Sequence, residues 1–287
     1  MTAPGRLVTA APLAHLRWDP PAGPGLQVPA LVLLLHGVGG GRQAWDDACM
    51  GAGQGSGARL AAAGYSAVAI DFPGYGLSAA IQPLTLAGMA AAVAALIAHL
   101  GAGPATVVGH SMGGMVAQEL IATTPQAVRA LVLAGTSPAF GKPGGDWQQQ
   151  FLQSRFAPLD AGLGMAGLAA PLVAGMVAPG TPAAARAAAR ALMAGVPEAT
   201  YRAALSALVV FDGRADLPRI GVPTLVITGA HDRTAPPEVA RKMAERIPGA
   251  QLALLPDAGH LLNIEQPQAF NAALLGFLAA LGGQSRP

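Results

Sequence analysis

The sequence predicts an α/β fold, with a mostly parallel sheet covered by helices on both faces and one helical insertion. Short uninterrupted apolar runs, typical of strands buried on both faces, recur along the chain, and helical patterns separate them. Strands that alternate with helices form a parallel sheet whose connections place helices on both faces. The insertion is predicted because this alternation stops after Gly135 and only helical patterns continue to Arg214.

The first half of the chain supplies the leading strands and helices. Residue 8 and residues 13–18 are predicted as edge strands of a leading hairpin. The next predicted strands are residues 30–35, 65–70, 106–108 and 130–134. The predicted helices are residues 45–63, interrupted by glycines at 51–57, then residues 85–100, and a segment that follows Ser111 and ends before Pro125. Thr85 is a suitable N-cap for the second of these helices.

The insertion contains four predicted helices, at residues 146–156, 160–177, 182–194 and 197–210. Thr181 and Pro182 have the pattern of an N-cap followed by proline at the first helical position, and Pro197 also suits a first helical position. Apolar side chains are frequent here, so the segment is expected to fold. Because an insertion at the carboxyl end of a strand lies over the site, we expect residues 137–214 to form a helical cap (lid) on a core of residues 1–136 and 215–287.

The sheet resumes after the insertion. Residues 223–228 and 251–255 are the last predicted strands, and residues 237–247 form a helix between them. A final helix is predicted over residues 266–281. In parallel sheets of this kind, ligands bind at the carboxyl ends of the strands, so the turns that follow these strands are the candidate site.

Composition excludes several classes of protein. The chain has 287 residues, 52% hydrophobic and 11% charged, with a formal net charge of +2. Its lysines and arginines are scattered, so no nucleic-acid partner is expected. Cys49 is the sole cysteine, which excludes an intrachain disulfide and a cysteine-based metal site. The start of the chain lacks the apolar core of a secretory signal, and the apolar run 86–98 is shorter than the roughly 20 residues of a membrane span. We therefore expect a cytoplasmic monomer or homodimer.

Ser111 is the candidate nucleophile. It lies in Gly109-His110-Ser111-Met112-Gly113, which follows a short apolar run and precedes a helical pattern. This strand, turn and helix is the context of a nucleophile elbow, a strained turn that points the serine hydroxyl out of the fold. Gly109 and Gly113 leave room where side chains would collide with the neighbouring strand and helix.

A second glycine-rich turn, residues 36–41, follows the strand that ends at Leu35. Its backbone N–H groups can point at a ligand. A phosphate loop is the rival interpretation, but no Gly-Lys-Ser/Thr follows. Residues 53–58 match a dinucleotide fingerprint only nominally, because no apolar strand precedes them. We therefore expect Gly37 to shape a turn in which Val38 donates its N–H to a developing oxyanion, together with the N–H of Met112.

The base and the acid are sought at other strand ends. His260 follows the last strand in a flexible loop and is the predicted base, whereas His36 and His231 are expected to be structural. His110 neighbours Ser111, but adjacent residues in an elbow point apart. Asp232 follows the strand 223–228 and is the predicted acid, because it can orient the imidazole. The two other candidate acids are Asp71, expected to fix a loop, and Asp257, expected to stabilise a turn.

The motifs LLLHGVGG, DFPGYGLS, GHSMGG, PTLVITGAHDRTAPP and DAGHLLNIEQPQAF occur in this order, and with them the chain resembles the α/β-hydrolase superfamily. The resemblance implies an eight-stranded sheet and the chain order nucleophile, acid, base, carried by Ser111, Asp232 and His260. Residues 229–277 resemble 3-oxoadipate enol-lactonases and related small esterases. Two features depart from the enol-lactonases, namely His110, where Leu or Ile is usual, and the glycine-rich segment 45–57.

Three functions fit this pattern. The first is hydrolysis of a small carboxylic ester or lactone through an acyl-enzyme, without a metal or an organic cofactor. The second uses the same triad for acyl transfer, carbon–carbon bond hydrolysis or perhydrolysis. The third is a non-catalytic ligand-binding relative. In each case we expect a modest apolar pocket under the cap, with His110, Trp147 and Phe151 among its lining residues.

Overall fold

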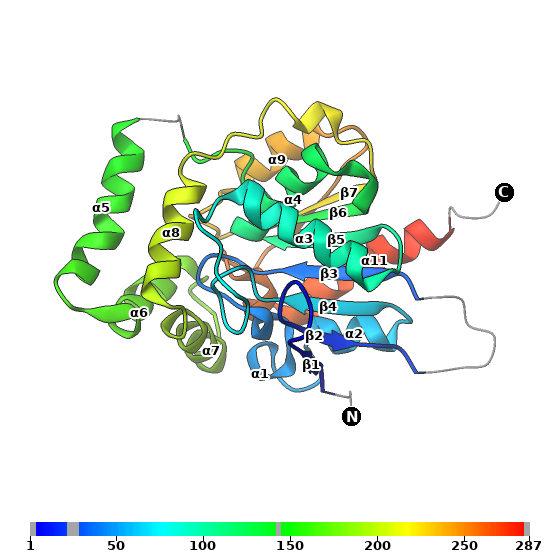
Figure 1. The fold of residues 1–287 in the computed structure, drawn as a ribbon, viewed down its shortest axis with the longest axis horizontal. Helices are drawn as coiled ribbons and strands as arrows, with labels where there is room; N and C mark the ends of the chain where they lie inside the picture. Colours follow the sequence, from blue (N-terminus) through cyan, green and yellow to red (C-terminus); the bar gives the residue numbers. More distant parts are fainter. Residues whose placement is uncertain (1–3, 22–28, 142–144, 284–287) are drawn as a thin grey trace.

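The centre of the molecule is a twisted sheet, which we describe from a computed structural model covering residues 4–21, 29–141 and 145–283. These described residues form eight strands in the order β1-β2-β4-β3-β5-β6-β7-β8. β3 to β8 run parallel, and β1 and β2 join antiparallel at one side (Figure 1). The predicted fold class is confirmed. The strands are β1 Arg6–Val8, β2 His15–Trp18, β3 Leu31–Leu35, β4 Ser66–Ile70, β5 Ala105–His110, β6 Val128–Ala134, β7 Thr224–Gly229 and β8 Gln251–Leu255.

Alternate side chains of the central strands enter two separate cores. Leu33, Leu35 and Val107 pack on the face covered by α3 Leu86–Leu100, α4 Met112–Thr123 and α9 Pro237–Arg246. Val32, Leu34 and Val108 pack on the opposite face, under α2 Ser56–Ala62 and α11 Pro267–Gly283. Figure 1 shows these two helical layers on either side of the sheet. Burial on both faces explains why the strands read as continuous apolar runs.

The strand register brings the candidate turns to one edge of the sheet. Leu35 at the end of β3 pairs with Gly109 in β5, and His110 pairs with Ala134 at the end of β6. The strand order reverses at β3, and such a switch point is where open α/β sheets form their crevice. The turns after β3, β5, β7 and β8 therefore open toward the same space.

Four α-helices lie between β6 and β7 in the described part of this segment, and we call them the helical insertion. They are α5 Asp146–Asp160, α6 Gly164–Met176, α7 Ala183–Ala194 and α8 Glu198–Leu208. Figure 1 shows them grouped beyond the ends of the strands, away from the helices that cover the sheet. Their number agrees with the sequence prediction, but α5 runs through Pro158 to Asp160 and α6 begins at Gly164, later than predicted.

The caps of the insertion differ from the prediction. Pro182 and Pro197 are N-cap residues of α7 and α8, not first helical residues. Thr181 does not cap α7, because its hydroxyl donates to the Glu265 carboxylate instead, at 2.7 Å. A distant partner therefore overrides the local capping pattern. Thr85 does cap α3, and its side chain accepts a hydrogen bond from the Gly88 N–H, as predicted.

Two further predictions of local structure are corrected, and one short helix was not predicted. β2 is not an edge strand, because it pairs with both β1 and β4. The segment 45–63 is not one interrupted helix, since Trp45 closes the short 3-10 helix Arg42–Trp45 and two separate helices follow, α1 Asp47–Met50 and α2. The C-terminal helix is preceded by a separate short helix, α10 Leu262–Glu265.

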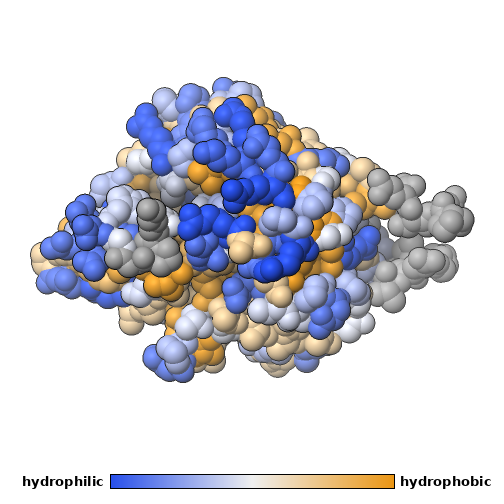
Figure 2. Space-filling view, turned by 90° about the horizontal axis from the view of Figure 1, so that it is seen from above, coloured by the Kyte–Doolittle hydropathy of each residue, from blue (hydrophilic) through white to orange (hydrophobic). Residues whose placement is uncertain are grey.

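Hydrophilic and hydrophobic side chains are interspersed on the face seen in Figure 2. No helix within the described ranges combines the length and the apolar character that crossing a membrane requires.

Candidate active site

Ser111 occupies a strained turn between β5 and α4. Its φ of 53° and ψ of −119° make it the one non-glycine residue of positive φ in the described part of the chain. Such a conformation costs of order 1–3 kcal/mol and persists only where the surroundings enforce it. A Cβ at Gly113 would lie 2.5 Å from the Leu35 carbonyl oxygen, and a Cβ at Gly109 would collide with the Gly113 carbonyl. Close packing of β3, β5 and α4 thus requires both glycines.

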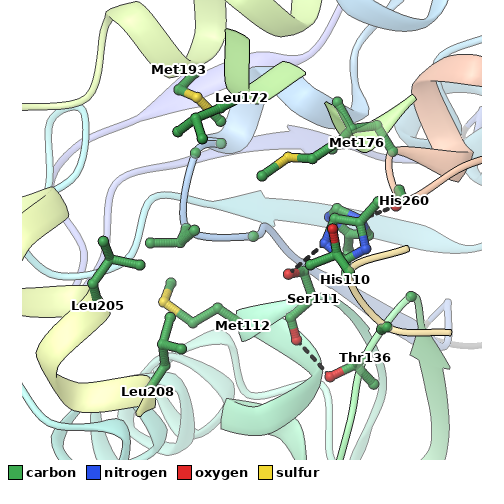
Figure 3. A pocket seen from close by; sticks show the side chains of 18 of the residues that line it. His110, Ser111, Met112, Thr136, Leu172, Met176, Met193, Leu205, Leu208 and His260 are labelled. Atoms are coloured by element: carbon green, nitrogen blue, oxygen red, sulfur yellow. Dashed lines mark hydrogen bonds between the residues drawn. The ribbon is translucent and has the colours of Figure 1, made fainter. Parts of the chain in front are cut away.

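The neighbouring strand end holds the elbow in place. The Ser111 N–H donates to the Ala134 carbonyl at 2.9 Å, and the Thr136 hydroxyl donates to the Ser111 carbonyl at 2.7 Å. Figure 3 shows Thr136 beside Ser111 with this bond drawn. Both groups of the Ser111 backbone are therefore fixed by the end of β6 and the turn after it, which stabilises the strained conformation.

Ser111, His260 and Asp232 form one hydrogen-bonded chain. His260 Nε2 lies 3.0 Å from Ser111 Oγ, and His260 Nδ1 lies 2.9 Å from Asp232 Oδ2. The imidazole and the carboxylate are buried. The three side chains come from the turns after β5, β7 and β8, which the sheet brings to one edge. The structure thus brings together the three residues predicted as nucleophile, base and acid.

The surroundings of Asp232 favour its ionised form. Burial penalises the charge, but the neighbouring His260 and hydrogen bonds from His260 and from the N–H groups of Ala235 and Thr234 outweigh that penalty and hold the pKa of Asp232 below its usual value. The Thr234 and Ala235 N–H groups both donate to Oδ1, at 2.8 and 2.9 Å. Oδ2 is thereby left to accept the Nδ1 proton of His260, which fixes the ring with Nε2 toward Ser111.

The other candidate histidines and acids make no hydrogen bond to Ser111 in the described chain. His110 Nε2 donates to the His260 carbonyl at 2.8 Å, so its ring does not bond to Ser111. It supports instead the loop of residues 256–261 that carries His260, which we call the base loop. His36 donates from Nδ1 to the Gly37 carbonyl at 2.7 Å and accepts the Phe72 N–H at Nε2. His231 and Asp257 are exposed.

Asp71 is buried beside the turn that follows β3. Its carboxylate accepts the Arg42 N–H at 2.9 Å and the Leu77 N–H at 3.1 Å, and it pairs with the Arg42 guanidinium. Asp71 therefore ties together the glycine-rich turn and the loop after β4.

Two of the buried histidines, His36 and His110, predict a loss of stability in mild acid. Burial lowers the pKa of His36 and of His110 from the ordinary 6.5 to about 4. Between these two pH values the unfolded chain binds protons that the folded chain does not. We expect the free energy of unfolding to fall, by on the order of 1 kcal/mol per pH unit for each histidine, as the pH drops from about 6.5 to about 4. Urea unfolding across this interval measures the slope, and His110→Gln should make it shallower. An unchanged slope in that variant would contradict the assignment.

Val38 and Met112 come from two different turns and line the same cavity as Ser111. Neither backbone N–H has an acceptor within the described residues, although both residues line the cavity in front of Ser111. The Tyr75 hydroxyl donates to the Val38 carbonyl at 3.0 Å. Burial raises the pKa of Tyr75, so that the hydroxyl keeps the proton it donates. This contact fixes the peptide that follows Val38.

A cavity of about 590 Å³ extends from Ser111 under the helical insertion. Ser111 and His260 lie at one end with Met176 beside His260, and Leu172 and Leu205 lie across the space (Figure 3). Most of the wall is apolar, while Arg155 and Arg233 contribute charged side chains. The predicted lining residues His110, Trp147 and Phe151 do contribute to it, together with Gly37, Val38 and Met112.

Three residues in contact with the site were not predicted from the sequence, namely Thr136, Tyr75 and Glu265. Tyr75 lies in the motif DFPGYGLS, so a glycine-rich loop after a strand was the available signal for it. Glu265 lies in the motif DAGHLLNIEQPQAF, but the motif does not indicate its partner in the insertion, Ala178. Thr136 carries no local signal, because its partner Ser111 comes from another segment. In the residues the structure describes, no cluster of three or more His, Cys, Asp or Glu side chains is arranged to hold a metal ion.

Comparison with known proteins places the chain in a family. The α/β hydrolase family matches residues 32–273. The polyketide synthase ThaQ of Burkholderia thailandensis is 32% identical over 254 residues, which are 86% of this chain and only 12% of that protein. The 3-oxoadipate enol-lactonase 2 of Acinetobacter baylyi is 31% identical over 73% of this chain and 77% of its own length.

A solved structure agrees with these relatives. A thermophilic esterase from Thermogutta terrifontis, with malate bound, superimposes with a TM-score of 0.78 at 25% identity and covers 98% of this chain and 99% of its own. The resemblance stated from the motifs is therefore confirmed. The chain belongs to the α/β hydrolase family and is a hydrolase of that fold.

Proposed function

We propose that this enzyme hydrolyses a small carboxylic ester or lactone through a covalent acyl intermediate on Ser111. The observation that carries the proposal is the hydrogen-bonded chain from Ser111 through His260 to Asp232 at the end of a largely apolar cavity. A serine hydroxyl is a weak nucleophile at neutral pH, and an adjacent base oriented by a third group activates it. Esterases and a lactonase among the relatives support this substrate class.

The mechanism has two symmetrical halves. Ser111 Oγ attacks the carbonyl carbon while its proton passes to His260 Nε2, and Asp232 stabilises the imidazolium. The tetrahedral intermediate collapses, His260 protonates the departing alkoxide oxygen, and the acyl group stays on Ser111. Water then attacks the acyl carbon and gives a proton to His260. The second intermediate releases the carboxylic acid and restores the serine.

The oxyanion formed in each half requires two donors. We assign the N–H groups of Val38 and Met112 to this role, since both are free of acceptors in the described chain and both residues line the cavity that contains Ser111. Each donor of this kind is typically worth about 10²–10³ in rate. The Tyr75 hydroxyl, by fixing the peptide after Val38, preserves the orientation of that turn.

The helical insertion, within residues 137–214, serves as a cap that selects the substrate. Its side chains contribute to the apolar wall of the cavity, among them Leu172, Met176 and Leu205. Each methylene buried there contributes about 0.8 kcal/mol. Two added methylenes should thus raise kcat/KM by roughly tenfold, because 1.36 kcal/mol off the barrier corresponds to a factor of ten.

A substrate panel tests the proposal. We expect turnover of p-nitrophenyl acetate, with kcat/KM rising for the butyrate and hexanoate as the acyl chain fills the cavity, and a lactone panel measured by acid release completes the comparison. Adding an alcohol to the same assay shows whether the acyl group moves to water or to the alcohol, which separates hydrolysis from acyl transfer. Failure to turn over any ester or lactone would contradict the proposed function.

A further inference from the structure

The side chain of Glu265 is buried at the junction between the His260 loop and the helical insertion. It is 3% exposed and comes from the short helix α10. Its Oε2 accepts hydrogen bonds from the Ala178 N–H at 2.7 Å, the Thr181 hydroxyl at 2.7 Å and the Gly259 N–H at 3.0 Å. Its Oε1 accepts the Leu261 N–H at 2.9 Å. One side chain thus connects two segments that lie far apart in the sequence.

The four partners of Glu265 fit an ionised carboxylate. All of them are donors, and no lysine or arginine pairs with this side chain within the described residues. A buried charge is costly unless hydrogen bonds replace its hydration. Four charge-assisted bonds offset that cost only while both segments keep their positions. The arrangement therefore fixes the two segments relative to each other.

Two of the four donors flank the predicted base. Gly259 and Leu261 are the neighbours of His260 in the chain, so the carboxylate holds the backbone on both sides of the imidazole. The His260 N–H itself donates to the Met176 carbonyl at 2.8 Å. Gly259 approaches the insertion so closely that an added Cβ would lie 2.5 Å from the Met176 oxygen. The base loop and the end of α6 are in direct backbone contact.

The other two donors belong to the insertion. Ala178 and Thr181 follow α6, and the side chain of Met176, at the end of α6, lines the cavity next to His260 (Figure 3). A substrate in contact with the Met176 side chain would therefore contact the residue whose carbonyl accepts the His260 N–H. The bonds made by Glu265 keep this segment at a fixed distance from the base loop.

We propose that Glu265 is a positioning residue that sets the His260 imidazole against Ser111 by clamping the base loop to residues 176–181 of the insertion. The inference rests on the proposed function, because it assigns His260 the role of base. Weakening the hydrogen bonds of this clamp should lower the rate constant of the chemical step more than the affinity for substrate. A displacement of about 1 Å at the reacting groups can cost roughly 100-fold in rate.

Glu265→Gln tests the clamp, because it keeps the size of the side chain but turns one acceptor into a donor that faces an N–H group. We expect kcat for a p-nitrophenyl ester to fall by about 10- to 100-fold, with KM changed by less than about threefold. The rate constant for labelling of Ser111 by a fluorophosphonate probe should fall by a similar factor, since labelling requires the base but not the acyl pocket. Thermal unfolding is measured in parallel.

Asn271→Ala is the matched control for stability. Asn271 is also 3% exposed and joins α11 to the start of α2, because its amide N–H donates to the Gln54 carbonyl and its amide oxygen accepts the Ser56 hydroxyl. Asn271→Ala should lower the melting temperature about as much as Glu265→Gln does, while its kcat and its rate of labelling by the probe stay at the parent values. Equal kcat in Glu265→Gln and the parent would overturn the proposal, and so would an equal loss of kcat in Asn271→Ala.

A second variant covers the case in which Glu265→Gln does not fold. Thr181→Val keeps the shape of the side chain and removes one donor to the carboxylate, so we expect a smaller loss of kcat, about threefold to tenfold, in a folded protein. Parent kcat in this variant would then overturn the clamp. The two proposals can fail separately. Ester hydrolysis retained in Ser111→Ala would contradict the proposed function. Parent kcat in the Glu265 variant, together with loss of activity in Ser111→Ala, would overturn only the clamp.

Discussion

Replacing Ser111 by alanine is expected to abolish ester hydrolysis, with a loss of about 10⁶ in kcat, the size seen when the nucleophile of a serine protease triad is removed. The loss is this large because no other group supplies the covalent step. The fold should survive, since the backbone of residue 111 is held by the Ala134 carbonyl and the Thr136 hydroxyl and neither contact uses the Ser111 side chain. Steady-state turnover of p-nitrophenyl butyrate and urea unfolding measure the two quantities.

Ser206→Ala is the control for this variant. Ser206 is an exposed residue of α8 whose hydroxyl donates to the Arg202 carbonyl, outside the cavity. The variant Ser206→Ala should keep the full activity of the parent enzyme. If Ser111→Ala retained more than about one hundredth of the parent kcat while folded, covalent catalysis by Ser111 would be wrong.

Asp232→Asn is expected to lower kcat by about 10⁴, the effect of the corresponding change in a chymotrypsin-type triad. The Thr234 and Ala235 N–H groups fix an oxygen at the Oδ1 position, so the new amide NH₂ must face His260. His260 then carries its proton on Nε2, which points at Ser111 and can no longer accept the serine proton. Kinetics of the folded variant measure the loss.

Asp257→Asn provides the comparison for the acid. Asp257 is exposed, and its backbone carbonyl, not its carboxylate, accepts a hydrogen bond from Gln266. We expect parent activity from this variant. Activity within tenfold of the parent in Asp232→Asn would show that Asp232 does not orient the base.

Local patterns predicted the parts of this fold that depend on neighbours in the sequence. The strand, turn and helix around Ser111 are specified by glycines within two residues of it, and Thr85 caps α3 as its position indicates. The apolar runs predicted the strands because burial on both faces leaves no polar alternation. These features require no knowledge of which segments meet in space.

Features that depend on distant partners were not predicted. The place of β2 between β1 and β4 follows from strand pairing across the sheet, which the sequence of β2 does not record. Thr181 has the pattern of a helix cap but bonds to Glu265. Glu265 lies within the motif DAGHLLNIEQPQAF, but that motif does not indicate its bonds to Ala178 and Thr181. The predicted triad residues could be chosen because they follow strands, and their catalytic roles stay predictions, as do the cap boundaries, the cytoplasmic location and the choice between monomer and homodimer.

Ser111 is proposed to form a covalent bond to the substrate, with His260 as the base that activates it. Labelling with a fluorophosphonate probe followed by peptide mass spectrometry measures the formation of such a bond, with His260→Gln as the variant that lacks the base. We expect a single modified peptide that contains Ser111, and labelling slowed by several orders of magnitude in the variant. Modification of another residue, or an unlabelled Ser111 in enzyme that still hydrolyses esters, would contradict this proposal.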